Sequence, residues 1–177
     1  SLSYSAAFIK FSEQDFITAR DAFKKYIEEF DNGIFINDAY YYLAYSHLDL
    51  GDSIGANFCF SYLAENKVSM YLENALIYLA RDCFGKNDFT NSNMFYADLE
   101  EIASNNSIKR EVVIRLMYGF ELIDNKKAMQ YANKVLGLDK TDNWLVSRAK
   151  IIISRYDFEL GNYFKAKNIF REIVELD

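Results

Sequence analysis

Apolar residues recur with the period of an α-helix along most of this 177-residue chain. Two clear stretches are Leu76, Leu79, Ala80 and Cys83, and Ile169, Phe170, Ile173, Val174 and Leu176. No segment alternates between apolar and polar residues for long enough to predict a β-strand. Turn-forming residues at 31–33 and 105–107 separate periodic stretches. The pattern therefore predicts an all-α protein.

We expect ten helices that form five pairs, and we name the first helix of a pair helix A and the second helix B. Helix A is predicted over residues 3–12, 37–50, 70–85, 109–123 and 143–160. Helix B is predicted over residues 15–30, 53–65, 88–104, 126–137 and 163–176. The composition agrees, because the chain has no proline and only 7 glycines, and β-folds use more of both at their turns.

The pairs are copies of one repeating unit. A small residue recurs in helix B every 36–38 residues, at Ala19, Ala56, Ser92, Ala128 and Ala166. Four residues later come Phe23, Phe60, Tyr96, Ala132 and Phe170. Turn residues precede each small residue, as in Gly51-Asp52 and Gly161-Asn162. We therefore divide the chain into repeats at about 1–33, 34–68, 69–106, 107–139 and 140–177 within a single domain.

The repeat resembles the tetratricopeptide repeat (TPR), a helix–turn–helix unit of about 34 residues. The best copy is Leu160-Gly161-Asn162-Tyr163 with Ala166 and Phe170. The fourth copy has a shortened turn and lacks the aromatic residue of helix B, and the family's frequent proline after helix B is missing. The resemblance implies a right-handed superhelix, or α-solenoid, with a concave side, and a chain cut from a longer array.

Stacking of the five pairs is expected to form one continuous core. Small residues in both helices allow neighbours to approach closely, and Phe60, Tyr96 and Phe170 are predicted to fill the gaps between repeats. Val174 and Leu176 are expected to lean on a further helix pair beyond the chain. Exposed ends of the array also allow self-association.

The net charge of the chain argues against nucleic acid as a partner. The net charge is −6 and the isoelectric point is near 4.9, so the chain lacks the concentrated basic face that nucleic acid requires. No apolar run approaches the roughly 20 residues that span a bilayer. The start of the chain, Ser1 to Tyr4, has no signal pattern. The compartment stays open between the cytoplasm and the periplasm or cell envelope.

No arrangement of residues predicts catalysis, a metal or a cofactor. The chain has one histidine, His47, which we expect to be packed and hydrogen-bonded, and two cysteines, Cys59 and Cys83, which we expect to be buried free thiols. Carboxylate pairs such as Glu100-Glu101 fit solvated outer faces of helix B. We therefore expect a protein that is not an enzyme.

The TPR resemblance implies a binding groove on the helix A residues that point away from helix B. These residues are Tyr41, Tyr45 and Leu48; Ile77, Arg81 and Phe84; Val113, Met117 and Phe120; and Ile151, Arg155 and Phe158. Each trio lies on one stripe of its helix. The alternative is that long connections or an extra helix cover these stripes and make them core.

The groove, if open, predicts a non-catalytic scaffold that binds a protein or peptide. We expect an apolar or aromatic partner segment with an acidic residue that meets Arg81 or Arg155. Tyr41 and Tyr45 occupy positions where chaperone-binding members of the family carry Lys and Asn, so that specificity does not transfer. The alternative function is a structural or sensory segment that assembles or regulates a larger protein.

Overall fold

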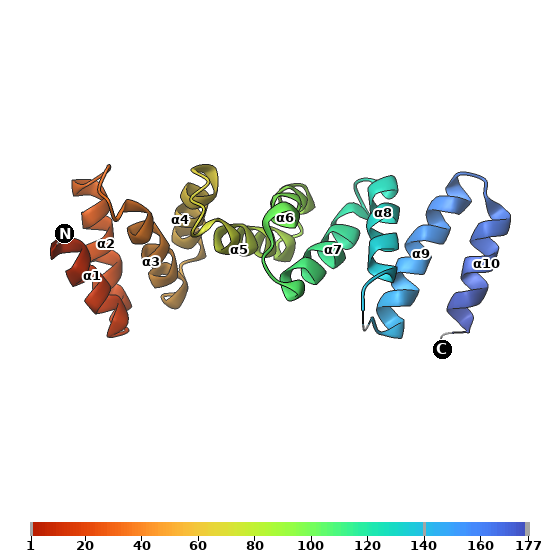
Figure 1. The fold of residues 1–177 in the computed structure, drawn as a ribbon, viewed down its shortest axis with the longest axis horizontal. Coiled ribbons are helices and arrows are strands. Elements are labelled where there is room, and N and C mark those ends of the chain that lie inside the picture. Colours follow the sequence, from red (N-terminus) through yellow and green to blue (C-terminus); the bar gives the residue numbers. More distant parts are fainter. Residues whose placement is uncertain (1, 140, 176–177) are drawn as a thin grey trace. The chain divides into compact units, whose positions relative to one another are not determined.

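The computed structural model describes residues 2–139 and 141–175, and ten α-helices lie within these residues (Figure 1). They are α1 (Leu2–Ser12), α2 (Phe16–Glu29), α3 (Ile36–Asp49), α4 (Ser53–Glu65), α5 (Leu72–Gly85), α6 (Phe89–Ile102), α7 (Asn106–Phe120), α8 (Asn125–Leu136), α9 (Asn143–Glu159) and α10 (Tyr163–Val174). The all-α prediction is confirmed, and each predicted boundary differs by at most three residues. Leu176 lies outside the described residues.

Helices that follow one another along the chain pack together, as in α2 with α3, α7 with α8 and α8 with α9. This neighbour-to-neighbour packing makes the chain a helical-repeat array, consistent with an α-solenoid. The contacts group residues 1–79 and 80–177 into two compact units, and the boundary lies within α5. The right-handed superhelix, its concave side and the single domain stay predictions.

The turn between helix A and helix B has the same construction in three repeats. An aspartate N-cap accepts a hydrogen bond from the backbone N–H three residues later, at Asp15, Asp52 and Asp88. The residue before each aspartate has a left-handed backbone, as Gly51 shows with φ 74°. Gly161 repeats this conformation before Asn162. In the fourth repeat Asp124 caps α8 in the same way, but Ile123 before it is not left-handed.

The different turn of the fourth repeat shifts the register of its helix A. In the other repeats a small, fully buried residue of helix A lies 12 positions before the small residue of helix B; these residues are Ala7, Ala44, Ala80 and Ser154. In α7 the buried residues Val112, Leu116 and Met117 repeat the spacing of Ala39, Leu43 and Ala44. Met117 therefore takes the place of the small residue, only 11 positions before Ala128.

Because of this shift, the prediction that Met117 lines the groove is wrong. One residue corresponds to a rotation of about 100° around a helix, so the shorter connection turns Met117 into the core. There it packs with Ala132, Val135 and Ile152. Its side chain is fully buried and lines no open surface.

The residue four positions after the small residue of helix B fills the gap between repeats, as predicted for Phe60 and Tyr96. Phe23, Phe60 and Tyr96 are fully buried. Phe170 has the same position in α10, but 45% of it is exposed. The prediction that Phe170 is a core residue is therefore wrong, because no described helix packs on the outer side of α10.

Replacement of Phe60 and of Phe170 by alanine should test the difference in burial between these two positions. Phe60→Ala should lower the free energy of unfolding by about 3–5 kcal/mol, because it empties a buried site. Phe170→Ala should lower it by less than about 2 kcal/mol, because much of its apolar surface is already exposed. Urea denaturation followed by circular dichroism measures both values. Equal losses would contradict the assigned burial.

Two glycines inside helices allow a buried polar side chain to approach the backbone. A Cβ added to Gly119 in α7 would lie 1.9 Å from Oδ1 of Asn93 in α6. A Cβ added to Gly55 in α4 would lie 2.3 Å from Nδ1 of His47 in α3. Both distances are far below van der Waals contact, so a side chain at either position would force Asn93 or His47 to move.

Gly119→Ala should therefore lower the free energy of unfolding by about 1–3 kcal/mol, although alanine is the better helix former by about 1 kcal/mol. Gly85→Ala is the matched control in the same unit, because no atom lies within 4 Å of its added Cβ. This control should leave stability unchanged or raise it. Asn93→Ala combined with Gly119→Ala should recover part of the loss, and a Gly119→Ala protein as stable as the wild type would contradict the packing.

Candidate partner-binding surfaces

The helix A stripe of the first unit is an aromatic cluster. The ring of Tyr41 lies 4.1 Å from the ring of Tyr71 and 4.9 Å from that of Tyr45. Tyr45 also packs edge-on against Phe60, at 5.7 Å. Burial, followed by a hydrogen bond with Tyr41, raises the pKa of Tyr45 to about 12. Tyr41, Tyr45 and Ile77 are all partly buried, so these side chains are held by their neighbours and are only partly available to a partner.

The two arginines that were predicted to meet an acidic partner already have carboxylate neighbours. Nε and Nη2 of Arg81 donate to the two carboxylate oxygens of Glu111, at 2.7 and 2.5 Å. The hydroxyl of Tyr96 also donates to Glu111, at 3.0 Å. Nη1 of Arg155 donates to Glu121 at 3.2 Å. In the second unit these two guanidinium groups therefore link helix A to the helix A of the next repeat.

The register shift changes which residues of α7 belong to the stripe. The residues equivalent to Arg81 and Phe84 are Tyr118 and Glu121. Phe120 instead faces α8, where its ring stacks on Tyr131 at 5.8 Å and Lys127 lies 5.0 Å from its centre. The shortened turn of the fourth copy was visible in the sequence, but its effect on the facing of α7 was missed.

Phe84 lies in a hollow of the second unit that we name the Phe84 pocket. Its volume is about 330 Å³, and it is lined by Phe84, Phe89, Arg115, Tyr118, Glu121, Leu122 and Arg148. The rings of Phe84 and Phe89 meet edge-on at 5.3 Å. The guanidinium carbon of Arg115 lies 4.5 Å from the centre of the Phe84 ring. Aromatic walls with an arginine at the edge are typical of interface hot spots.

The two arginines that line the Phe84 pocket differ in whether they form an ion pair. Nη2 of Arg148 donates to both carboxylate oxygens of Glu121, at 2.8 and 2.7 Å, and Arg155 shares the same carboxylate. Arg115 is exposed, and no carboxylate among the described residues lies within ion-pair distance of it. The pocket therefore presents one guanidinium group that forms no close ion pair with a carboxylate of the described residues.

The hydroxyl of Tyr118 is the second unsatisfied group at this pocket. Its oxygen is buried and has no hydrogen-bond partner among the described residues. Burial raises the pKa of the Tyr118 hydroxyl. A buried hydroxyl without a partner destabilises the folded state.

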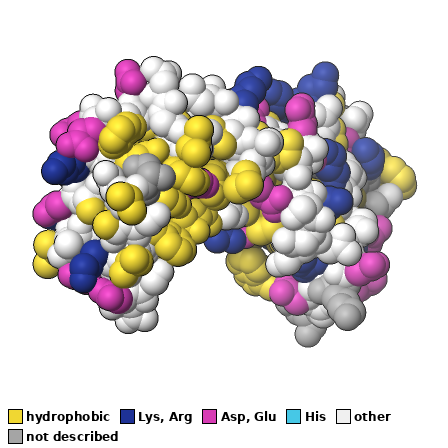
Figure 2. Space-filling view, turned by 60° about the vertical axis from the view of Figure 1, so that its left-hand side comes forward, with side chains coloured by type: hydrophobic (Ala, Val, Ile, Leu, Met, Phe, Trp, Pro, Cys, Tyr) yellow, Lys and Arg dark blue, Asp and Glu magenta, His cyan; other side chains and the backbone are white. Residues whose placement is uncertain are grey.

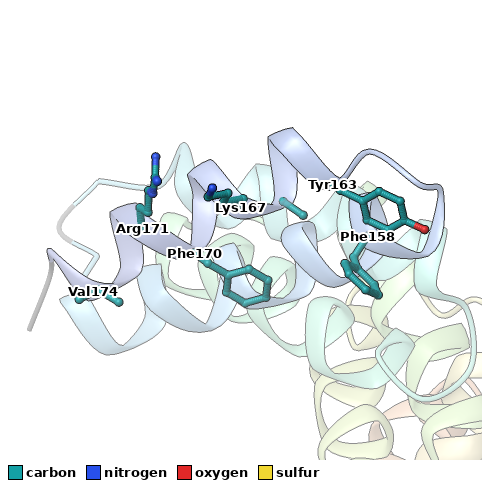
Figure 3. A pocket seen from close by; sticks show the side chains of 7 residues that line it. Phe158, Tyr163, Lys167, Phe170, Arg171 and Val174 are labelled. Carbon is teal, nitrogen blue, oxygen red and sulfur yellow. The ribbon is translucent and has the colours of Figure 1, made fainter.

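Phe158 lies on a different surface, a hollow of about 450 Å³ along α9 and α10 (Figure 3). Its ring meets that of Tyr163 at 5.1 Å. Figure 3 shows Phe170 further along α10 and Val174 near its end, with Arg171 directed away from Phe170. Ala166 and Lys167 complete the lining. We name this surface the α10 face.

The residues that could carry other chemistry are packed inside. His47 is buried, with Nδ1 2.8 Å from Oδ2 of Asp52, and burial lowers its pKa. Cys59 is a buried free thiol whose pKa is raised to about 12 by burial, and Cys83 is free and partly buried. Within residues 2–139 and 141–175, no three His, Cys, Asp or Glu side chains gather as metal ligands would.

No protein-family model and no curated protein matches this chain. In the described part of the chain, no helix has the length and apolar character needed to cross a membrane.

Two tyrosine-to-phenylalanine substitutions in the second unit test whether the hydroxyl of Tyr118 has a hydrogen-bond partner. Tyr118→Phe should leave the free energy of unfolding unchanged or raise it by up to about 1 kcal/mol, because it removes a buried polar group without a partner. Tyr131→Phe should lower it by about 1–3 kcal/mol, because the Tyr131 hydroxyl donates to Glu100 at 2.7 Å. Chemical denaturation compares the two. A loss for Tyr118→Phe as large as that for Tyr131→Phe would show that its hydroxyl has a partner.

Proposed function

We propose that this chain is a non-catalytic protein-interaction module built from TPR-like repeats, and that its Phe84 pocket binds a segment of a partner protein. The observation that carries the proposal is an aromatic hollow at Phe84 of the helix A stripe, with the guanidinium group of Arg115 over the Phe84 ring and no described carboxylate in an ion pair with it. The repeat spacing, the turn construction and the ten-helix array support the TPR-like assignment.

The lining of the pocket favours a particular partner segment. Phe84, Phe89 and Leu122 offer apolar surface that would be removed from water by an apolar or aromatic side chain. Arg115 lies at the same site and would pair with a carboxylate of the partner at little cost, because no internal ion pair has to be broken first. Arg81 and Arg155 are less suited, because each would have to leave Glu111 or Glu121.

The structure around the pocket supports binding without a large rearrangement. Arg148, Arg155 and Glu121 connect α9 to the end of α7 through hydrogen bonds of 2.7–3.2 Å. The Glu121 carboxylate is largely buried between the two guanidinium groups. A pre-formed wall reduces the entropy lost when a partner binds.

A peptide-array screen tests the proposal, with arrays that include segments pairing an aromatic residue with Asp or Glu. Arg115→Glu should weaken the selected peptides about ten-fold or more, because it reverses the charge beside Phe84. Lys109→Glu is the matched control: it makes the same change of charge on the same helix, outside the pocket lining. This control should change affinity less than about three-fold.

Circular dichroism should show that both variants keep the helical fold. Equal weakening by Arg115→Glu and Lys109→Glu would attribute binding to general charge and contradict a role for the pocket. Peptides that bind equally well to the wild type and to Arg115→Glu would place the binding site elsewhere.

A further inference from the structure

A hollow in the first unit, which we name the His47 pocket, has the size and the lining of a small-molecule site. Its volume is about 770 Å³, within the range of such sites. Its buried lining consists of Leu43 and His47 of α3 and Cys59 of α4. The apolar residues around this buried part come from three helices and are Ile27, Tyr40, Ile54 and Phe58.

The apolar walls of the His47 pocket are open to water. Ile54 is 82% exposed and Phe58 is 68% exposed. Figure 2 shows hydrophobic side chains gathered over a face of the first unit. The ring of Tyr40 lies 6.4 Å from that of Phe58 and stacks on Tyr62 at 3.7 Å, which holds it in place. An aromatic ring of a ligand would remove these walls from water and would find aromatic partners there.

His47 supplies a hydrogen-bond acceptor to this pocket. Its Nδ1 lies 2.8 Å from Oδ2 of Asp52, although the contact is not aligned as a hydrogen bond. Two lone pairs would repel each other at this distance, so Nδ1 carries the proton and Nε2 of the neutral ring carries a lone pair. Burial, followed by the charge of Lys24, lowers the pKa of His47 and favours the neutral ring. No hydrogen bond joins Nε2 to a residue that the structure describes, so this nitrogen is left for a ligand.

Lys24 supplies a positive charge at the edge of the pocket. It is exposed and forms no close ion pair with a carboxylate of the described residues, whereas its neighbour Lys25 pairs with Glu29. After burial, the charge of Lys24 is the next largest influence on the pKa of both His47 and Cys59. The ammonium group therefore lies near the buried lining.

Two carboxylates also line the pocket, and neither cancels this charge. Oδ1 of Asp52 accepts a hydrogen bond from the backbone N–H of Gly55 at 2.9 Å, and Oδ2 faces Nδ1 of His47. Glu28 is not among the charges that shift the pKa values of His47 and Cys59. Lys24 is therefore the free charge closest to the buried lining.

We propose that the His47 pocket binds a small aromatic carboxylate whose ring carries a hydrogen-bond donor, as a phenol or an indole does. The ring would pack against Tyr40, Ile54 and Phe58. The O–H or N–H of the ring would donate to Nε2 of His47, and the carboxylate would pair with Lys24. All of these residues lie in the first unit, apart from the Phe84 pocket, so the proposal goes beyond the proposed function and does not depend on it.

NMR spectroscopy tests the proposal directly, because His47 is the only histidine of the chain and its imidazole signals are unambiguous. The probe is 3-(4-hydroxyphenyl)propionate, titrated into the full chain at neutral pH. The His47 signals should shift until they reach a plateau, with a dissociation constant of about 1 mM or tighter. Signals that do not move, or that drift linearly without a plateau, would overturn the proposal.

Three related probes test each part of the proposed ligand. 3-Phenylpropionate lacks the hydroxyl and should bind about five-fold more weakly, because Nε2 of His47 then has no donor. Tyramine carries an ammonium in place of the carboxylate and should bind about ten-fold more weakly. N-acetyltyrosinamide represents a tyrosine within a peptide, has no carboxylate, and should also bind about five-fold more weakly.

Each of these probes has an outcome that contradicts the proposal. Equal binding of 3-phenylpropionate would remove the role of His47. Tighter binding of tyramine would assign the charge of the site to Glu28. Equal binding of N-acetyltyrosinamide would assign the pocket to a tyrosine of a partner protein.

Two lysine variants provide the matched comparison. Lys24→Gln should weaken 3-(4-hydroxyphenyl)propionate about five-fold and leave N-acetyltyrosinamide unchanged. Lys25→Gln makes the same change of charge at the next position of α2, outside the pocket lining, and should change affinity less than about two-fold. Equal losses in the two variants would attribute binding to general charge and overturn the proposal.

Phe58→Ala tests the apolar wall and should weaken all four probes about three-fold or more. Because Phe58 is largely exposed, the variant should keep the helical fold, which circular dichroism checks. Unchanged affinities in a folded Phe58→Ala protein would place the aromatic ring outside the His47 pocket.

Discussion

Close packing of a helix B against the helix A that follows it, as in α2 with α3, α6 with α7 and α8 with α9, is the contact on which the rest of this structure depends. In all pairs except the fourth, one small residue in each helix lets the two backbones approach, and helix B carries a large residue four positions after its small one. The next helix helps to bury Phe23 and Tyr96, because the ring of Phe23 stacks on Tyr42 of α3 and the hydroxyl of Tyr96 donates to Glu111 of α7. A single pair therefore cannot bury its own apolar surface, and stability is shared between neighbours along the chain.

Two buried polar side chains lie where neighbouring helices approach most closely. Asn93 reaches α7 because Gly119 has no side chain, and His47 reaches α4 because Gly55 has none. Glycine weakens a helix by about 1 kcal/mol relative to alanine, so its presence inside two helices indicates that the close approach matters more than local helix stability. The same principle explains why small residues recur at Ala44, Ala80 and Ser154.

Much of the fold could be predicted from the sequence, because turn residues and the period of apolar residues are local signals. The positions of α4 and α9 followed directly from them. The facing of α7 could not be predicted in the same way, because a one-residue difference in a turn changes which side chains are buried. The exposure of Phe170 was missed for another reason: burial at that position depends on a neighbouring helix, and not on Phe170 itself.

The candidate site was only partly predictable for a related reason. Phe84 could be placed on the helix A stripe from its spacing, but the partners of Arg81 and Arg155 depend on the distance between side chains of different repeats. Arg115 departs from the other repeats, since three of its four equivalents, Tyr42, Tyr78 and Ile152, are apolar or aromatic and the fourth is Ser5. It could be recognised only after the register of α7 was known.

The turn before α8 has a broader consequence. The connection there is one residue shorter than in the other repeats, and α7 accordingly turns different positions of its sequence toward the core and toward the surface. A change in length at a turn can therefore give one repeat a new surface chemistry while its neighbours stay as they were. In repeat proteins of this kind, short insertions and deletions at turns are a route to new binding specificity that substitutions alone would reach only through many separate steps.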